Sequence, residues 1–288
     1  MQTHEILDAR RLIHIALAED LADSSDLTTN MMISKEDRGS VKIGARQTGV
    51  LAGVELIPLV FQEIDGDVNC QISMRDGATL NPGDCVARLE GSVRSLLTAE
   101  RTVLNFLTCL SGIASLTRQY VTAAKRPKTK ILDTRKTIPG LRSLQKYAVR
   151  CGGGTNHRVG LYDAVLVKDN HLAAWIGHSG HTLAEAVRHV RSKTPQGMIV
   201  EFEVDTLEQL REILPERPDM VLLDNMSLND LETAVSLRNE LAPGVLLEAS
   251  GGVNLETVGG IAATGVDRIS IGALTHSAPA LDLGFDWE

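Results

Sequence analysis

Short aliphatic runs alternate with helical segments through the second half of the chain, and this alternation restricts the fold more than any other feature. Between the runs, apolar residues recur at helical spacing, for example over residues 183–193, 206–214 and 228–241. Such alternation is typical of βα units that form a parallel sheet. The near-continuous Val, Ile and Leu of the runs indicate strands buried on both faces. The predicted strands are residues 130–133, 164–167, 199–204, 220–224, 245–250 and 268–272.

Polar residues follow almost every predicted strand. An α/β barrel builds its ligand site at the carboxyl ends of its strands, whereas an open doubly wound sheet uses mainly one switch point. Because nearly every strand ends in a polar group, we predict a barrel, and because six strands are evident, an incomplete one. These polar groups are Asp133 to Lys136, Lys168 to Asn170, Glu203, Asp224 with Asn225, Ser250 to Gly252, and Gly272.

The first half of the chain has a different pattern. Residues 5–19 and 95–125 have helical character, and the region from Gly39 to Arg94, rich in Gly and Val, indicates strands and turns. Residues 141–150 are expected to form a helix that ends near Gly152. A length of 288 residues suits one large or two ordinary domains.

Charge is distributed unevenly along the chain. The formal net charge is −8, but the window from Arg94 to Arg158 carries thirteen Lys and Arg against two acids, or +11. A charge run is commonly a solvated helix face, and the alternative is a pocket for a multiply anionic ligand. The acidic balance of the whole chain argues against a nucleic-acid-binding protein.

Composition also predicts the compartment. No run of 18 apolar residues suggests a membrane span, and the first residues do not resemble a secretory signal. The four cysteines lack zinc-site spacing, so we expect a reducing, cytoplasmic compartment.

Four cationic residues are candidates for binding an anionic ligand: Arg135, Lys136, Arg158 and Lys168. Arg offers a planar fork for carboxylates and phosphates, and Lys a compact charge. If the four converge, their repulsion destabilises the empty site and a polyanion relieves it. The alternative is that each pairs with a surface acid, although the basic window contains only two.

Glu203 and Asp224 end successive predicted strands, and two such carboxylates suit one Mg²⁺ ion. Glu201 shares the strand face of Glu203 and is a further candidate ligand. The open alternative is that these acids form salt bridges with Lys168 or Arg158.

Glycine-rich loops and two histidines complete the candidate site. Ser250, Gly251 and Gly252 follow a strand and are predicted to cradle a phosphate, with Gly272 and Ala273 beside them, although such a tripeptide is often a plain turn. His157 is a candidate partner of a ligand carboxylate, and His276 a second histidine of the same site. Each histidine is equally compatible with a core position.

The segment DTRKTIPGLRSLQKYAVRCGGGTNHRVGLYDAVLVKDNHL (133–172) closely resembles the quinolinate phosphoribosyltransferase family. The resemblance extends to residues 97–115, 201–210, 222–226, 247–253 and 269–282, and so covers nearly the whole chain. The sequence departs from the family pattern at residues 25–29, away from the predicted chemistry.

The resemblance implies an α/β fold of two domains. An N-terminal α/β sandwich would span residues 1–113 and an incomplete parallel α/β barrel residues 114–277, with the tail 278–288 packing back on the first domain. The implied reaction joins quinolinate to phosphoribosyl pyrophosphate with Mg²⁺, releasing pyrophosphate and CO2 and forming nicotinate mononucleotide for NAD biosynthesis.

The resemblance also implies residue roles. Arg135, Lys136, His157, Arg158 and Lys168 would surround quinolinate and the ribosyl phosphates, and Arg101 would reach the neighbouring active site of a homodimer. The implied catalytic residues are Lys136, Lys168, Glu203 and Asp224, of which the last two hold the metal. The implied substrate-binding set is Arg101, Thr134, Arg135, Lys136, His157, Arg158, Lys168, Glu203, Asp224, Ser250, Gly251, Gly252, Gly272, Ala273 and His276.

Two rival functions fit parts of this pattern. One is a molybdenum-locus relative of the same family with another substrate, and the other is a phosphate-barrel binding module without turnover. The full T-R-K, N-H-R and V-K-D-N-H set favours quinolinate over the first rival, and the combination of a metal pair with a dicarboxylate pocket argues against the second.

Overall fold

The computed structural model describes residues 1–126 and 128–288, which divide into two compact units. The first unit comprises Met1–Arg118, Lys136–Gly153 and Ala273–Glu288, and the second comprises Gln119–Arg135 and Gly154–Gly272. The expected domain boundaries after residues 113 and 277 stay predictions. No helix in the described part of the chain has the length and apolar character needed to cross a bilayer.

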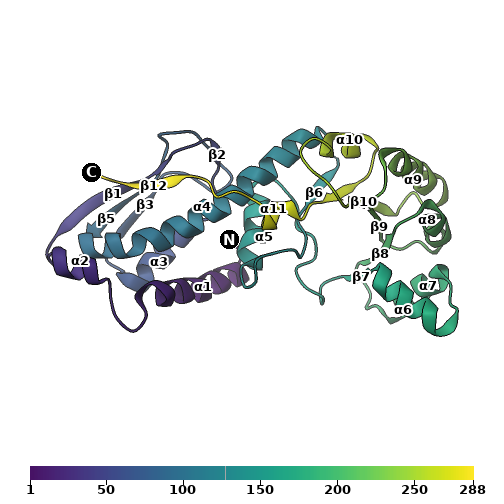
Figure 1. Cartoon of the computed structure of the whole chain (residues 1–288), viewed down its shortest axis with the longest axis horizontal. Coiled ribbons are helices and arrows are strands. Elements are labelled where there is room, and N and C mark those ends of the chain that lie inside the picture. The colour runs from purple at the N-terminus through teal and green to yellow at the C-terminus, as the bar shows by residue number, and fades with distance from the viewer. Residues whose placement is uncertain (127) are drawn as a thin grey trace. The chain divides into compact units, whose positions relative to one another are not determined.

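The first unit is built on an antiparallel sheet with strand order β12-β1-β5-β3. The long helix α4 runs beside this sheet and continues into the second unit (Figure 1). The elements are α1 (Thr3–Leu21), α2 (Leu27–Met32), β1 (Arg38–Ala45), β2 (Gly49–Val50), α3 (Leu56–Ile64), β3 (Asn69–Ile72), β4 (Thr79–Leu80), β5 (Cys85–Ser92), α4 (Val93–Ala124), α5 (Arg142–Cys151), α11 (Ala273–His276) and β12 (Leu283–Trp287).

Strand β5 shows why this sheet has one covered face. Ala87 and Leu89 are buried, whereas Arg88 and Glu90 are exposed. Successive side chains of a strand point to opposite faces, so the alternation buries one row and solvates the other. An antiparallel sheet with this pattern needs packing on one side.

Helix α3 lies within the region for which the sequence predicts strands and turns. Its sequence, LIPLVFQEI, is apolar on several faces and contains Pro58, which obscures the helical period. Pro58 is tolerated because it stands in the first turn, where a backbone N–H has no partner within the helix. Leu56, Ile57, Val60 and Phe61 are the buried residues of the helix.

The C-terminal tail packs closely on α4 within the first unit. The Leu281 N–H donates to the Thr108 carbonyl at 2.9 Å. A Cβ added to Gly112 would lie 2.0 Å from the Pro279 carbonyl oxygen. Only a glycine at position 112 therefore allows this approach of two backbones.

The second unit contains a six-stranded parallel sheet with strand order β6-β11-β10-β9-β8-β7. The helices lie outside the strands (Figure 1). The elements are β6 (Lys130–Leu132), β7 (Val165–Val167), α6 (Asp169–Ser179), α7 (Leu183–Lys193), β8 (Val200–Val204), α8 (Leu207–Ile213), the 3-10 turn η1 (Leu214–Glu216), β9 (Met220–Asp224), α9 (Leu228–Leu241), β10 (Leu246–Ser250), α10 (Val258–Ala263) and β11 (Arg268–Ser270).

This topology confirms the predicted fold class. All six strands lie where the aliphatic runs predict them, and every residue of β8 is buried. The first two strands of the unit, β6 and β7, stand at opposite ends of the sheet. The sheet is therefore that of an incomplete α/β barrel, with all carboxyl ends at one edge.

The close approach at Gly112 generates a stability prediction. Gly112→Ala should lower the midpoint of urea unfolding, because the methyl group must displace the tail at a cost of about 1–3 kcal/mol. The matched control is Gly177→Ala in α6, where an added Cβ meets nothing within 4 Å. That variant should be neutral or stabilised, since Ala favours helix over Gly by about 1 kcal/mol. Equal midpoints for the two variants would contradict the packing described.

Candidate active site

The carboxyl ends of the parallel strands bring together most of the predicted site residues in the second unit. Thr134 and Arg135 follow β6, Lys168 follows β7, and Gly272 comes shortly after β11. Glu203, Asp224 and Ser250 belong to the ends of β8, β9 and β10. The role of each of these residues stays a prediction.

Asp133 anchors the loop that carries His157 and Arg158. Its fully buried carboxylate accepts the His157 backbone N–H at 2.9 Å and the Asn156 side-chain N–H at 2.6 Å. The Thr155 N–H donates to the Ile131 carbonyl at 2.8 Å, which fixes the loop beside β6. Two distant segments, 131–135 and 155–158, thereby become neighbours.

Arg135 and Arg158 converge in this neighbourhood. Burial, and then the charge of Arg135, lowers the pKa of Arg158. Arg158 Nη1 donates to the Ala164 carbonyl at 3.1 Å, and Arg135 Nε is buried without a hydrogen-bond partner among the described residues. Two guanidinium groups held together, one with an unsatisfied donor, suit an anion with carboxylate geometry.

A lysine and two carboxylates form the next part of the site. Lys168 Nζ donates to Glu203 Oε2 at 2.6 Å, so the predicted alternative of a salt bridge to Lys168 is present. Burial, and then the charges of Glu203 and Asp205, raises the pKa of Asp224. A cavity of about 500 Å³ borders Glu203 and is also lined by Asp169, Asp205 and Glu212, among other residues. The local excess of negative charge favours a cation.

The loop after β10 has the backbone conformation of an anion cradle. Gly251 and Gly252 have φ values of +94° and +59°, which favour glycine. A Cβ at Gly251 would lie 2.1 Å from Asn225 Oδ1, whereas one at Gly252 would meet nothing within 4 Å. The Asn225 N–H donates to the Ser250 carbonyl at 2.9 Å. The loop is thus closely packed at Gly251 and open at Gly252, where a ligand can approach the backbone.

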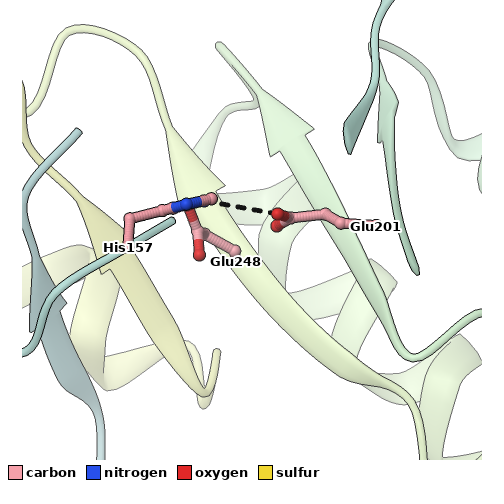
Figure 2. A group of neighbouring side chains, drawn as sticks. All are labelled: His157, Glu201 and Glu248. Atoms are coloured by element: carbon pink, nitrogen blue, oxygen red, sulfur yellow. Dashed lines mark ion pairs between the residues drawn. The ribbon is translucent and has the colours of Figure 1, made fainter. Parts of the chain in front are cut away.

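His157 lies between two buried carboxylates (Figure 2). Its Nε2 is 3.2 Å from Glu201 Oε2 and 3.3 Å from Glu248 Oε1, and Arg268 Nε donates to Glu248 Oε2 at 2.9 Å. Burial lowers the pKa of His157, whereas the hydrogen bonds to Glu201 and Glu248 act in the opposite direction. The predicted Mg²⁺-ligand candidate Glu201 thus contacts His157.

The hydrogen bond at Nδ1 decides what this cluster can do. Three of its atoms lie within 4.8 Å of one another, close enough for a metal. However, His157 Nδ1 accepts the Arg158 N–H at 2.7 Å, which places the ring proton on Nε2. A protonated Nε2 donates to carboxylates and does not bind a metal ion. The cluster is therefore a hydrogen-bonded network.

The remaining predicted site residues belong to the first unit. Arg101 is exposed on α4. Lys136 is also exposed, and its carbonyl accepts the Thr275 hydroxyl at 2.7 Å. Ala273 begins α11, which ends at His276, whose Nδ1 lies 2.6 Å from the Ser277 hydroxyl oxygen.

Sequence reasoning missed Glu248 and Arg268 as parts of this network. The signal for Glu248 was an acid in the middle of the buried run VLLEAS, and Arg268 begins the next run, RISIG. A charge inside a buried strand requires a partner, so both residues deserved a place among the candidates.

The fold is that of an α/β barrel, and the charged groups at its strand ends form a site suited to anionic ligands. The family model of the quinolinate phosphoribosyl transferase C-terminal domain matches residues 113–286 of this chain. The model of the N-terminal domain of the same family matches residues 26–111. The chain belongs to the quinolinate phosphoribosyltransferase family and is a phosphoribosyltransferase.

Individual relatives agree with this assignment over nearly the full length. A Mycobacterium leprae nicotinate-nucleotide pyrophosphorylase (carboxylating) is 47% identical over 96% of both chains. A Nicotiana glauca quinolinate phosphoribosyltransferase (decarboxylating) is 39% identical over 97% of this chain and 82% of its own. The solved nicotinate-nucleotide pyrophosphorylase of Francisella tularensis has a TM-score of 0.89 at 39% identity, covering 98% of this chain and 96% of its own.

The carboxylates at the sheet edge predict a pH-dependent stability change. Because the pKa of Asp224 is raised in the folded state, its ionisation destabilises that state above this pKa. Asp224→Asn should therefore raise the thermal unfolding midpoint at pH 7, and the gain should shrink as acidification protonates the native carboxyl.

Asp219→Asn is the control with the opposite sign. Burial alone would raise the pKa of Asp219, but Arg191, whose Nη1 donates to it at 2.8 Å, and the Val200 N–H outweigh burial and lower it. That variant should lose up to about 1 kcal/mol at pH 7. The loss should disappear as pH falls through the pKa of Asp219. A lower midpoint at pH 7 for Asp224→Asn would overturn the charge assignment.

Proposed function

We propose that the chain transfers the phosphoribosyl group of phosphoribosyl pyrophosphate to quinolinate, with loss of CO2 and pyrophosphate, forming nicotinate mononucleotide for NAD biosynthesis. The observation that carries the proposal is the convergence of Arg135 and Arg158, with a buried unsatisfied donor, at the carboxyl ends of the strands. A pyridine dicarboxylate supplies the planar negative groups that two such arginines bind. The relatives are named for the same carboxylating or decarboxylating chemistry.

The proposed roles divide the site into three parts. Arg135 and Arg158, with Thr134 and Lys136, form the quinolinate side, and His157 contributes to it through its hydrogen bond to the Arg158 backbone N–H. Lys168, Glu203 and Asp224 form the pyrophosphate side. The loop from Ser250 to Gly252, with Gly272, Ala273 and His276, receives the ribose 5′-phosphate, since a ligand can approach the backbone at Gly252.

Glu203 and Asp224 are the proposed Mg²⁺ ligands. Their donor set fits this ion, because Mg²⁺ prefers carboxylate oxygens and usually retains water and phosphate ligands. The raised pKa of Asp224 reflects a surplus of carboxylates that a divalent cation would neutralise. When bound, Mg²⁺ supplies charge stabilisation for the departing pyrophosphate.

The protein's own contribution to the reaction is orientation and charge stabilisation. The quinolinate ring nitrogen forms a bond to the ribose anomeric carbon as the bond to pyrophosphate breaks, and Lys168 stabilises the leaving charge. Holding the two substrates in line contributes about 7–11 kcal/mol. The adjacent carboxylate then leaves as CO2. Its bond electrons remain on the ring carbon beside the cationic nitrogen, and that carbon takes up a proton.

A homodimer with a shared active site is part of the proposal. Arg101 is exposed on α4 and would donate its guanidinium to the site of the neighbouring subunit. The proposal also places the enzyme in the cytoplasm. Its four cysteines are all free thiols, which is typical of a reducing compartment.

Turnover tests the reaction directly. CO2 release from quinolinate labelled on the neighbouring carboxylate should require both phosphoribosyl pyrophosphate and Mg²⁺. Arg135→Ala should weaken quinolinate binding in calorimetry by about 10–100-fold, the loss expected for charged hydrogen bonds of about 1.5–3 kcal/mol. Arg211→Ala, exposed on α8, is the control and should bind normally. A protein that binds quinolinate without releasing CO2 would instead be the non-catalytic module, and one that binds none would have another substrate.

Subunit mixing tests the shared site. Arg101→Ala and Lys168→Ala proteins should each be inactive, whereas their random mixture should recover about a quarter of wild-type activity. Half of the dimers are then mixed, and each mixed dimer has one intact site. If mixed dimers form and activity stays absent, Arg101 does not act in the partner's site.

A further inference from the structure

The buried network around His157 includes two carboxylates without an assigned function. The side chains of His157, Glu201 and Glu248 are 9%, 2% and 0% exposed. They come from the loop before β7 and from strands β8 and β10, respectively, and converge on the ring Nε2 (Figure 2). Arg268 of β11 closes the network by donating to Glu248.

Stability alone does not account for this arrangement. Among the described residues, Glu201 Oε1 is buried without a hydrogen-bond partner, and Glu248 Oε1 is buried with only its ion pair to His157 Nε2 at 3.3 Å. Burying a carboxylate with an unsatisfied oxygen is costly, and replacing a complete buried ion pair by apolar residues of similar size is often neutral or stabilising. Two buried carboxylates around one ring nitrogen therefore point to a task that needs hydrogen-bond acceptors at these positions.

The His157 ring links these carboxylates to Arg158 through its two nitrogens. Nε2 is held by Glu201 and Glu248, and Nδ1 accepts the Arg158 backbone N–H at 2.7 Å. The backbone N–H of His157 itself is fixed on Asp133 at 2.9 Å. With the ring held at both nitrogens, the main chain at Arg158 has one favoured position relative to β8 and β10.

Arg158 needs such support because its neighbour repels it. Burial and the charge of Arg135 both disfavour the charged guanidinium at this position. The Ala164 carbonyl holds Arg158 Nη1 at 3.1 Å, so a shift of the main chain at Arg158 would strain this bond or move the guanidinium away from Arg135. Side chains that bind substrate are effective only when a surrounding shell holds them within a fraction of an ångström.

We infer that Glu201 and Glu248 are positioning residues that act through the His157 ring to hold Arg158 in place for the pyridine dicarboxylate substrate. This inference rests on the proposed function. Neither carboxylate contacts substrate in this arrangement, and neither belongs to the metal pair. Glu201 stands two residues before Glu203 on β8, one layer deeper in the sheet interior.

A pair of substitutions at Glu201 separates positioning from structure. Glu201→Met has nearly the same size but lacks an acceptor, and should weaken quinolinate binding at least about tenfold in calorimetry, as lost supporting hydrogen bonds do. Its thermal unfolding midpoint should fall, because the change removes one partner of a buried ion-paired network and leaves the others, so binding is measured well below that midpoint. Glu201→Gln retains an acceptor for the Nε2 proton and should bind within about threefold of wild type. Glu232→Met, exposed on α9, controls for the substitution itself.

A double-mutant cycle shows whether the effect passes through Arg158. In an Arg158→Ala background, Glu201→Met should cause no further loss of quinolinate affinity, because the group it positions is already absent. Additive losses would mean that Glu201 acts on substrate by another route. Normal quinolinate affinity in the single Glu201→Met variant would also overturn the inference.

Two further variants keep the test decisive if Glu201→Met does not fold. His157→Gln retains a donor near the Nε2 position but offers no acceptor for Arg158, and His157→Asn does the reverse. Both should weaken quinolinate binding, since the ring must bond the carboxylates at Nε2 and the Arg158 N–H at Nδ1. Wild-type affinity in either variant would exclude positioning of Arg158 through the His157 ring. If the wild-type protein itself binds no quinolinate, the proposed function fails. If the wild type binds and Glu201→Met binds equally, only the positioning role of Glu201 and Glu248 fails.

Discussion

Burial of the parallel strands on both faces is the constraint on which the rest of the second unit depends. Strands β8 and β9 are buried along almost their whole length. A polar side chain within them must either reach the carboxyl end of its strand or find a partner in the interior. Glu203 takes the first course and pairs with Lys168, whereas Glu201 takes the second and pairs with His157. The first pair belongs to the predicted reaction site, and the second belongs to the buried network that supports it.

Like charges are held together on both sides of the site. Arg158 is held beside Arg135, and Asp224 beside Glu203 and Asp205. Each grouping raises the free energy of the protein without ligands, and a ligand of opposite charge relieves it. Binding of an anionic substrate near the arginines, or of a cation near the carboxylates, would therefore be favoured because it relieves this repulsion. Substitutions that remove such repulsion commonly stabilise a protein while weakening its function.

The accuracy of the sequence predictions varied with the kind of signal. The six parallel strands were predicted correctly because burial on both faces leaves an aliphatic run that survives in any single sequence. Helix α3 was missed because its apolar residues surround the helix and Pro58 disguises the start. Glu248 was missed because it lies inside an aliphatic run, where its partner comes from a loop some 90 residues earlier, a long-range contact that no local pattern reports.

By itself, the sequence determined the order of the six parallel strands, the polar groups at the strand ends and the membership of the family. Only the tertiary structure decided how Glu201 and Glu203 differ. Alternation places both on one face of β8, but they stand about 6–7 Å apart along the strand. At the deeper position the His157 ring fills the interior, and at the outer one Lys168 and solvent are within reach. Depth within a sheet is set by the neighbouring strands and loops, so it has no signature in the strand's own residues.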